Sequence, residues 1–187
     1  LVIGLFLSLS VPASASVRDD IDAALVQLAP VKVMQTGRTY SLTVRGEAFS
    51  GTNGDFLSRR GPDEILSSGL SSGCGDHAAA FYGLLRAKGV TDLNYIEAVE
   101  LSVASLLERF SGHALVAVKD PRTKDWILVA PINNAVVSER WDPAAKVVHT
   151  PAGRFWVGYA GRLEDYPVKS PEQLKKSFRR TLRAVPV

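Results

Sequence analysis

Residues 71–89 read Ser-Ser-Gly-Cys-Gly-Asp-His-Ala-Ala-Ala-Phe-Tyr-Gly-Leu-Leu-Arg-Ala-Lys-Gly, and this stretch decides the fold. It opens with small polar residues, carries Asp76 in what would be a first helical turn, and ends with Lys88 and the terminator Gly89. These are the start and stop signals of an α-helix. One face of this helix is apolar and would be buried in a core; it consists of Ala78, Phe81, Leu84 and Leu85.

The only cysteine of the chain, Cys74, lies at the N-terminal end of this helix. Unsatisfied backbone N–H groups and the positive end of the helix dipole favour a thiolate there, so we expect a lowered thiol pKa. The same N–H groups could stabilise an oxyanion on a substrate carbonyl. Gly73 and Gly75 flank the cysteine and leave room for a substrate. The alternative is a buried cysteine that acts as a small apolar side chain.

A cysteine nucleophile needs a base, and the chain has three histidines. His113 opens the apolar segment Ala114–Val118, and a rigid strand start is a good platform for a base, although a lone histidine is more often structural. His77 is expected along the surface of the Cys74 helix, and His149 in an exposed loop. The pattern therefore favours His113 as the partner of Cys74.

The segments Ala114–Val118 and Trp126–Ala130 are joined by a turn-rich connection, which predicts an antiparallel hairpin. With the turn centred between Arg122 and Thr123, His113 faces a position near Ile132. Asn133 or Asn134 could then orient the imidazole ring, as in Cys-His-Asn arrangements, and we favour Asn133. A slip in register or a simple Asn-Asn turn is the alternative.

The rest of the chain predicts further helices and strands. We expect helices over 17–28, from Pro62 to Gly69, around 103–110 and over 170–184, strands over 40–45, 93–99 and 154–159, and a loop over 50–54. The chain shows no internal repeat and no second domain boundary. We expect one domain over residues 16–187.

Residues 1–15 form an apolar run that ends in Ala13-Ser14-Ala15. The run is too short to span a membrane, and its small-x-small end is typical of a cleaved signal peptide. We therefore expect a secreted or periplasmic protein with no transmembrane span in its mature form. In such a compartment a single cysteine cannot pair within the chain, so it must be buried or used.

The chain has 187 residues, a formal net charge of +3 and a pI of about 9.1. The C-terminal segment sets Leu174, Phe178 and Leu182 beside a row of lysines and arginines. We interpret it as an amphipathic helix with a solvated basic face; the alternative is contact with an anionic lipid or cell-wall polymer. No metal-ligand spacing and no phosphate-binding loop is found, so we expect no metal, no cofactor and no nucleic-acid partner.

Three motifs resemble those of transglutaminase-like domains, a branch of the papain-like superfamily. They are Gly73-Cys74-Gly75-Asp76-His77-Ala78 with the following helix, Gly112-His113-Ala114-Leu115-Val116, and Trp126-Ile127-Leu128-Val129-Ala130-Pro131. Their order is also the family's, and the core motifs span residues 62–134. The resemblance implies an α+β core in which the Cys74 helix packs on an antiparallel sheet that carries His113.

The chain departs from the family at one position that matters. Where the family has its catalytic aspartate, directly before a proline, this chain has Ala130. Three readings stay open: an asparagine substitutes, the site works as a Cys-His dyad, or catalysis has been lost.

The leading hypothesis is acyl transfer or amide hydrolysis on an extracytoplasmic protein or peptide, with Cys74 as nucleophile and His113 as base and then acid. Nothing in the sequence marks an amine-binding site, which favours water as the acceptor. The alternatives are a catalytically inactive binding or assembly module and a peptidoglycan amidase of another papain-like type.

Overall fold

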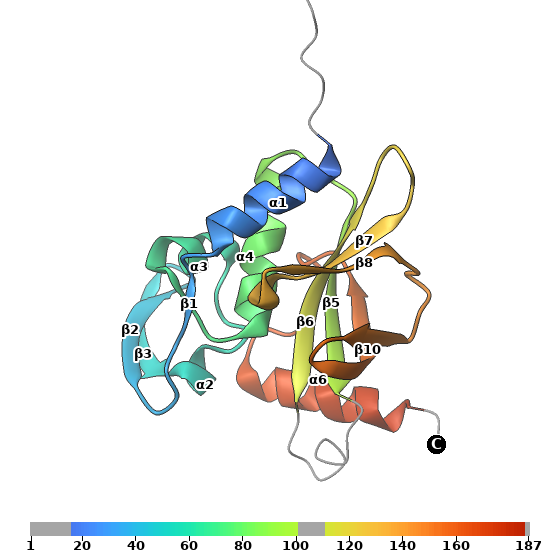
Figure 1. The fold of residues 1–187 in the computed structure, drawn as a ribbon. Coiled ribbons are helices and arrows are strands. Elements are labelled where there is room, and N and C mark those ends of the chain that lie inside the picture. The colour runs from blue at the N-terminus through green and yellow to red at the C-terminus, as the bar shows by residue number, and fades with distance from the viewer. Residues whose placement is uncertain (1–15, 101–110, 186–187) are drawn as a thin grey trace, which may run out of the picture.

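The computed structural model describes residues 16–100 and 111–185, which form an α+β fold around a six-stranded sheet (Figure 1). The order across this sheet is β8-β7-β6-β5-β10-β9, and every neighbouring pair is antiparallel. The strands are β5 (Leu93–Glu100), β6 (Gly112–Lys119), β7 (Trp126–Ala130), β8 (Ala135–Trp141), β9 (Val147–Thr150) and β10 (Gly153–Gly161).

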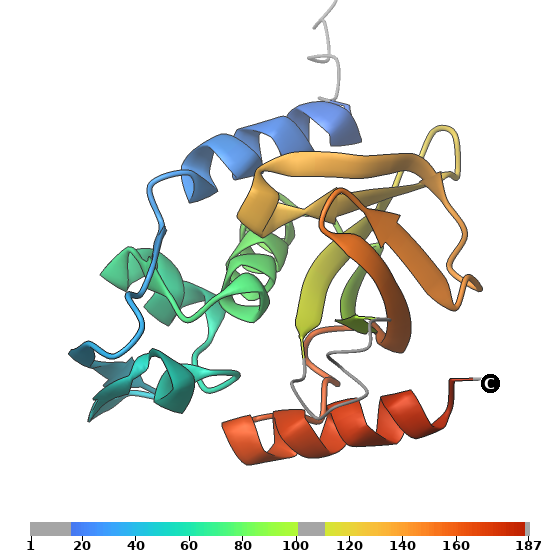
Figure 2. The same cartoon turned by 60° about the horizontal axis from the view of Figure 1, so that its bottom comes forward.

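Helices cover one face and one end of the sheet (Figures 1 and 2). The helices are α1 (Val17–Leu28), α2 (Asn53–Phe56), α3 (Pro62–Ser68), α4 (Cys74–Ala87), the 3-10 turn η1 (Pro131–Asn133) and α6 (Pro171–Arg183). Two small sheets lie on the far side of α4 from the main sheet: parallel β1 (Lys32–Val33) with β4 (Leu70–Ser71), and the hairpin β2 (Thr39–Val44) with β3 (Glu47–Thr52). Within the described ranges no helix is long and apolar enough to cross a membrane.

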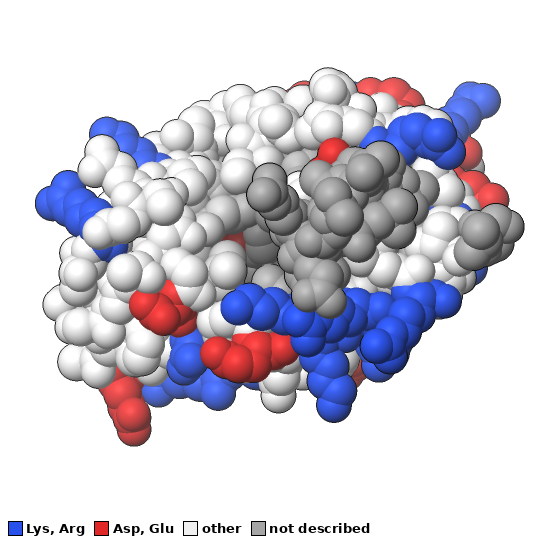
Figure 3. Space-filling model, turned by 90° about the horizontal axis from the view of Figure 1, so that it is seen from below, with Lys and Arg blue, Asp and Glu red and all other residues white. Residues whose placement is uncertain are grey.

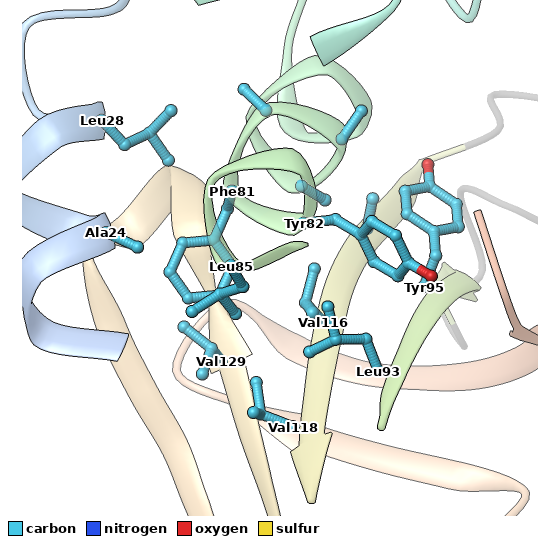
Figure 4. Close-up of a cluster of buried hydrophobic side chains, with 14 of the residues drawn as sticks. Ala24, Leu28, Phe81, Tyr82, Leu85, Leu93, Tyr95, Val116, Val118 and Val129 are labelled. Atoms are coloured by element: carbon cyan, nitrogen blue, oxygen red, sulfur yellow. The ribbon is translucent and has the colours of Figure 1, made fainter. Parts of the chain in front are cut away.

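The main core lies between α1, α4 and one face of the sheet. Figure 4 shows Phe81 and Leu85 of α4 pointing toward Val116 and Val129, with α1 closing the far side. Phe81 is fully buried. Because its removal would leave a large cavity, Phe81→Ala would cost about 3–5 kcal/mol. The predicted apolar face of the Cys74 helix is confirmed, and it holds α4 on the sheet.

The opposite face of the sheet carries a second, smaller core. Side chains alternate along β6, so Ala114, Val116 and Val118 face α4, whereas Leu115 and Ala117 join the second core. Ala130 and Leu128 of β7 belong to the same second core. By this alternation His113 belongs to the face of Leu115, the face away from α4.

The hairpin forms with the predicted register. Val116 pairs with Val129, and Lys119 pairs with Trp126, which centres the turn between Arg122 and Thr123. The described pairing of β6 with β7 starts only at Val116, so the first half of β6 extends past its neighbour. The N-terminus of α4 meets β6 at this uncovered edge.

Other sequence predictions have mixed outcomes. The helices over 17–28, from Pro62 and over 170–184 are confirmed to within a residue or two. The loop predicted over 50–54 is wrong, because these residues end β3 and begin α2, where Asp55 caps the turn through Thr52. Strands β8 and β9 were not predicted, and the helix expected around 103–110 lies outside the described residues.

Candidate active site

Cys74 is the first residue of α4 and is partly buried. The residue before it, Gly73, has a φ of 147°, a backbone conformation that favours glycine. This sharp entry turns the chain from β4 into the helix and sets the cysteine at the helix N-terminus. There the first N–H groups of the helix have no acceptor within it.

The Cys74 sulfur lies against the uncovered edge of β6. Its S–H donates to the carbonyl oxygen of Gly112 at 3.7 Å, and the backbone N–H of Ala114 donates to the sulfur. These are the groups that β7 would bind if it were longer. The thiol therefore occupies the place of a missing strand residue and is held by backbone alone.

Burial raises the pKa of the Cys74 thiol above its ordinary value. Backbone N–H groups of Ala114, Gly75 and Cys74 lower the pKa, but burial outweighs them. The sequence-based expectation of a lowered pKa is therefore wrong, because a helix N-terminus stabilises a thiolate only partly once the sulfur has left water. At neutral pH the resting group is the protonated thiol.

A buried ion pair fixes the turn that carries Cys74. The Arg60 guanidinium donates to the Asp76 carboxylate at 2.7 Å, and the same carboxylate oxygen accepts the N–H of Ser72 at 2.8 Å. Arg60 also donates to the carbonyl of Leu70 and the hydroxyl of Ser68. Three successive segments, α3, β4 and α4, are thus tied together. The sequence identified Asp76 only as a first-turn acid and gave no signal for Arg60.

His113 lines the same cavity as Cys74. Its ring packs on Phe155 of β10, with 5.1 Å between ring centroids. The ring nitrogen Nε2 is buried and has no hydrogen-bond partner among the described residues. Burial lowers the pKa of His113, so the imidazole is neutral at neutral pH. Both predicted residues, Cys74 and His113, thus line one cavity, but no described side chain orients the imidazole.

Position 130, where the resemblance to transglutaminase-like domains implies an orienting residue, is apolar. Ala130 is 1% exposed and lies in the second core, on the same sheet face as His113. Asn133 and Asn134 are both exposed, and neither lines the Cys74 cavity. The polypeptide reverses at η1, with Asn134 at a φ of 52°, and this turn carries both asparagines to the surface.

A carboxyl group that was not predicted lies in the Cys74 cavity. Glu97 of β5 pairs across the strands with Ala114 and is 2% exposed. It accepts hydrogen bonds from the hydroxyls of Tyr166 and Ser177. Burial raises its pKa from 4.5 to about 7. The available signal was an acid flanked by the apolar residues Ile96 and Ala98 within a strand.

Helix α6 closes the cavity on one side. The cavity has a volume of about 230 Å³, and Leu174 and Phe178 of α6 contribute to its wall. A Cβ atom at Gly112 would lie 2.1 Å from Cζ of Phe178. Glycine is therefore required at position 112 for the helix to pack this closely beside the thiol.

The two remaining histidines lie outside the cavity. His77 is buried, with Nδ1 3.3 Å from the carbonyl of Gly73, so its expected surface position is wrong. His149 is exposed as expected, but it lies on β9 rather than in a loop. Over residues 16–100 and 111–185, no three His, Cys, Asp or Glu side chains gather as metal ligands would.

Comparison with known proteins identifies no family. No family model matches the chain, and no curated protein matches it. A solved structure of Legionella pneumophila LapG in its calcium-bound form is similar, with 14% identity and a TM-score of 0.47 over 87% of this chain and 81% of that one. A likeness this weak carries no functional argument. The chemistry of the cavity itself must therefore indicate the function.

Proposed function

We propose that the protein is a thiol-dependent acyl-transfer enzyme or amidase that acts on a protein or peptide through Cys74 and His113. One observation carries the proposal: the chain's sole thiol starts a helix, at a cavity that His113 also lines. A cysteine kept only for packing has no need of a helix N-terminus, a cavity or a neighbouring imidazole.

The first step of the proposed reaction forms a thioester. The neutral imidazole of His113 accepts the S–H proton as sulfur bonds to the substrate carbonyl carbon. The imidazolium then returns this proton to the leaving amine as the C–N bond breaks. Water adds to the thioester through the same base, releasing the acid and restoring the thiol. An amine in place of water would give transamidation.

The N-terminus of α4 supplies the electrostatic part of the mechanism. The N–H groups of Gly75 and Asp76 lie in the first turn, where a helix offers donors without internal acceptors. Such donors stabilise the oxyanion of a tetrahedral intermediate. With Ala130 beside His113, the site would work as a dyad. A dyad with a protonated thiol must transfer its proton during attack, which predicts a modest rate.

We further propose a transglutaminase-like, papain-like fold and an exported protein. The order of Cys74 helix, His113 strand and following strand supports the fold. The apolar run that ends in Ala13-Ser14-Ala15 supports export, to the periplasm or the medium. The mature chain would then be the single domain of residues 16–187. Mass spectrometry of the protein secreted from a full-length gene would test both the export and the cleavage after Ala15.

A second candidate is a catalytically inactive binding module on the same scaffold. Three observations favour it: the alanine at position 130, the unpartnered Nε2 of His113 and the raised pKa of Cys74. In this case the cavity would bind a peptide without cleaving it. The two candidates differ in whether His113 acts on the thiol.

The experiment that separates them is the rate of Cys74 alkylation by iodoacetamide between pH 5 and pH 10. Because the chain has one cysteine, every label reports on this site. An enzyme should show two titrations, and His113→Asn should remove the lower one. Cys74→Ala is the control that should abolish labelling. A single titration above pH 9 that His113→Asn leaves unchanged would favour the binding module.

A further inference from the structure

A larger cavity adjoins the one that holds Cys74. Its volume is about 720 Å³, and it runs between α4, the segment from Ser58 to Pro62, and the segment from Leu163 to Lys169. The two cavities share part of their lining, namely Ser58, Gly75, Tyr95 and Tyr166. A molecule bound at the thiol therefore lies directly beside the larger cavity.

The floor of this cavity is the side of α4 that carries small residues, and Pro62 packs directly on this side at Gly83. Gly75, Ala79 and Gly83 recur every four residues and so lie on one side of the helix. From Gly75 to Arg86 the helix rises about 16 Å, which matches about five residues of an extended peptide. The cavity is therefore long enough for a short extended segment that starts beside the thiol and passes Pro62, which covers Gly83.

The walls of the cavity are rich in cationic groups. Five cationic side chains line it (Arg45, Arg59, Arg60, Arg86 and Lys169), against two carboxylates (Asp76 and Glu164). Asp76 is bound by Arg60 at 2.7 Å, and Glu164 lies 4.0 Å from Arg86 and 3.6 Å from Arg162. Both carboxylates are thus already paired within the protein.

Among the described residues, Arg45, Arg59 and Lys169 form no ion pair within 4.0 Å, although Arg59 lies near enough to Asp55 and Glu172 to lower the pKa of both carboxyl groups. The Arg45 guanidinium donates to the Lys169 carbonyl at 3.0 Å, which sets these two residues side by side. Nε of Arg59 is buried and has no hydrogen-bond partner in the described structure. Three cations that line one cavity, with a buried donor that no described acceptor uses, create a field that an anion would neutralise.

We infer that this cavity is the subsite for an acidic, extended peptide segment next to the bond presented to Cys74. Side-chain carboxylates of the segment would bind Arg45, Arg59 and Lys169. Leu163, Val168 and the rings of Tyr95 and Tyr166 would contact its apolar parts. These aromatic and aliphatic walls favour a peptide over a fully hydrated polyanion. The inference rests on the proposed function insofar as the occupant is called a substrate.

The exposed basic face of α6 is a second surface to which anions could bind. Lys175, Lys176, Arg179, Arg180 and Arg183 of α6 are all exposed, and Figure 3 shows Lys and Arg side chains gathered along this side of the molecule. Within the described part of the chain, none of these five side chains lines either of the two cavities. A polyanion such as polyphosphate would bind there by charge alone, and substitutions can separate the two sites.

Binding can be measured without turnover by using the full chain with Cys74→Ser. The probe is a fluorescein-labelled pentaglutamate peptide, its control is the pentaglutamine peptide, and the readout is fluorescence anisotropy. We expect the glutamine peptide to bind at least about tenfold more weakly. Arg45→Gln and Arg59→Gln should each weaken pentaglutamate binding about tenfold, and added salt should weaken it further.

Two control variants complete the test. Arg38→Gln, on an arginine outside the cavity, and Lys175→Gln with Lys176→Gln on α6 should leave the affinity within about twofold. Equal binding of both peptides, or a loss caused only by the α6 variants, would overturn the inference. Because Arg45 is exposed in a turn, its variant should fold even if that of Arg59 does not. If His113→Asn left the pH dependence of Cys74 alkylation unchanged while the acidic peptide still bound, the proposed enzyme activity would be rejected. The inference of an acidic-peptide subsite would stand.

Discussion

Cys74 and His113 line the same cavity, yet the structure anchors them very differently. The thiol is held by the carbonyl of Gly112 and the N–H of Ala114, and its helix start is fixed by the Arg60–Asp76 pair. The imidazole rests on an aromatic ring, with one nitrogen unpartnered among the described residues. Specific polar contacts therefore position Cys74, whereas His113 is held by packing in a buried environment.

The specific polar interactions of this site are therefore concentrated around the start of α4, not around His113. The position of the thiol is set by backbone groups at the edge of β6 and by the buried Arg60–Asp76 ion pair. None of these groups lies after β7 in the sequence. Orienting an imidazole needs a particular side chain at a particular register position, and that position holds Ala130. A different side chain at position 130 would therefore change the chemistry and leave the fold intact. Substitutions near Cys74 and near His113 should therefore have different effects.

The largest effect should come from removing the anchor of Cys74. Asp76→Ala leaves the buried Arg60 charge without its partner, so the free energy of unfolding should fall by about 3–5 kcal/mol. The measurement is urea denaturation followed by tryptophan fluorescence. Asp63→Ala removes an exposed first-turn acid of α3 and should cost only about 0.3–1 kcal/mol. Equal costs for the two variants would show that the ion pair does not hold the turn.

The next effect concerns Glu97, the carboxyl group on the thiol's side of the cavity. Its pKa is raised to about 7 in the folded protein from an ordinary value of 4.5, so the folded state prefers the neutral form. Its stabilising contribution is complete below pH 4.5 and is lost as the pH rises to about 7. The loss corresponds to about 3 kcal/mol.

Glu97→Gln tests this pH dependence. The variant should lose much less unfolding free energy than the wild type between pH 4.5 and pH 7, as measured by urea denaturation at four pH values. Glu47→Gln, at an exposed strand position, should retain the wild-type slope. Parallel curves for the wild type and Glu97→Gln would mean that the carboxyl group is ionised throughout.

A smaller effect should follow from giving His113 the anchor it lacks. The side chain of Ala130 lies on the same sheet face, diagonal to His113, within reach of a longer side chain. Ala130→Asp should raise the imidazole pKa by about one unit and speed Cys74 alkylation at pH 7 about tenfold. Ala130→Asn supplies a polar group without charge and should give a lesser gain. No change in either variant would mean that the ring faces away from position 130.

The smallest effect is expected at Asn133. Its side chain is exposed on η1 and does not line the cavity. Asn133→Ala should therefore change stability by less than about 0.5 kcal/mol and leave the alkylation rate within about twofold. Asn134→Gly is the matched control for the turn, since its backbone has positive φ. A tenfold slower reaction in Asn133→Ala would restore Asn133 as the orienting residue.

Much of the fold followed from the sequence because its signals were local. The Cys74 helix has an entry, an apolar face and a terminator within one segment, and the hairpin has a turn between two apolar runs. Strands β8 and β9 were missed because their residues are only partly buried and show little alternation. The loop predicted over 50–54 failed because Gly and Ser were counted as turn formers, whereas pairing with β2 holds them extended.

The sequence indicated which residues could react: one cysteine at the start of a helix and one histidine at the start of a strand. These follow from residue identity and nearby spacing, which the sequence carries in full. Only the tertiary structure decided the charge states, since burial raises the pKa of Cys74 and Glu97 and lowers that of His113. Burial depends on segments far apart in the chain, such as α6 packing on Gly112, and no local pattern specifies it.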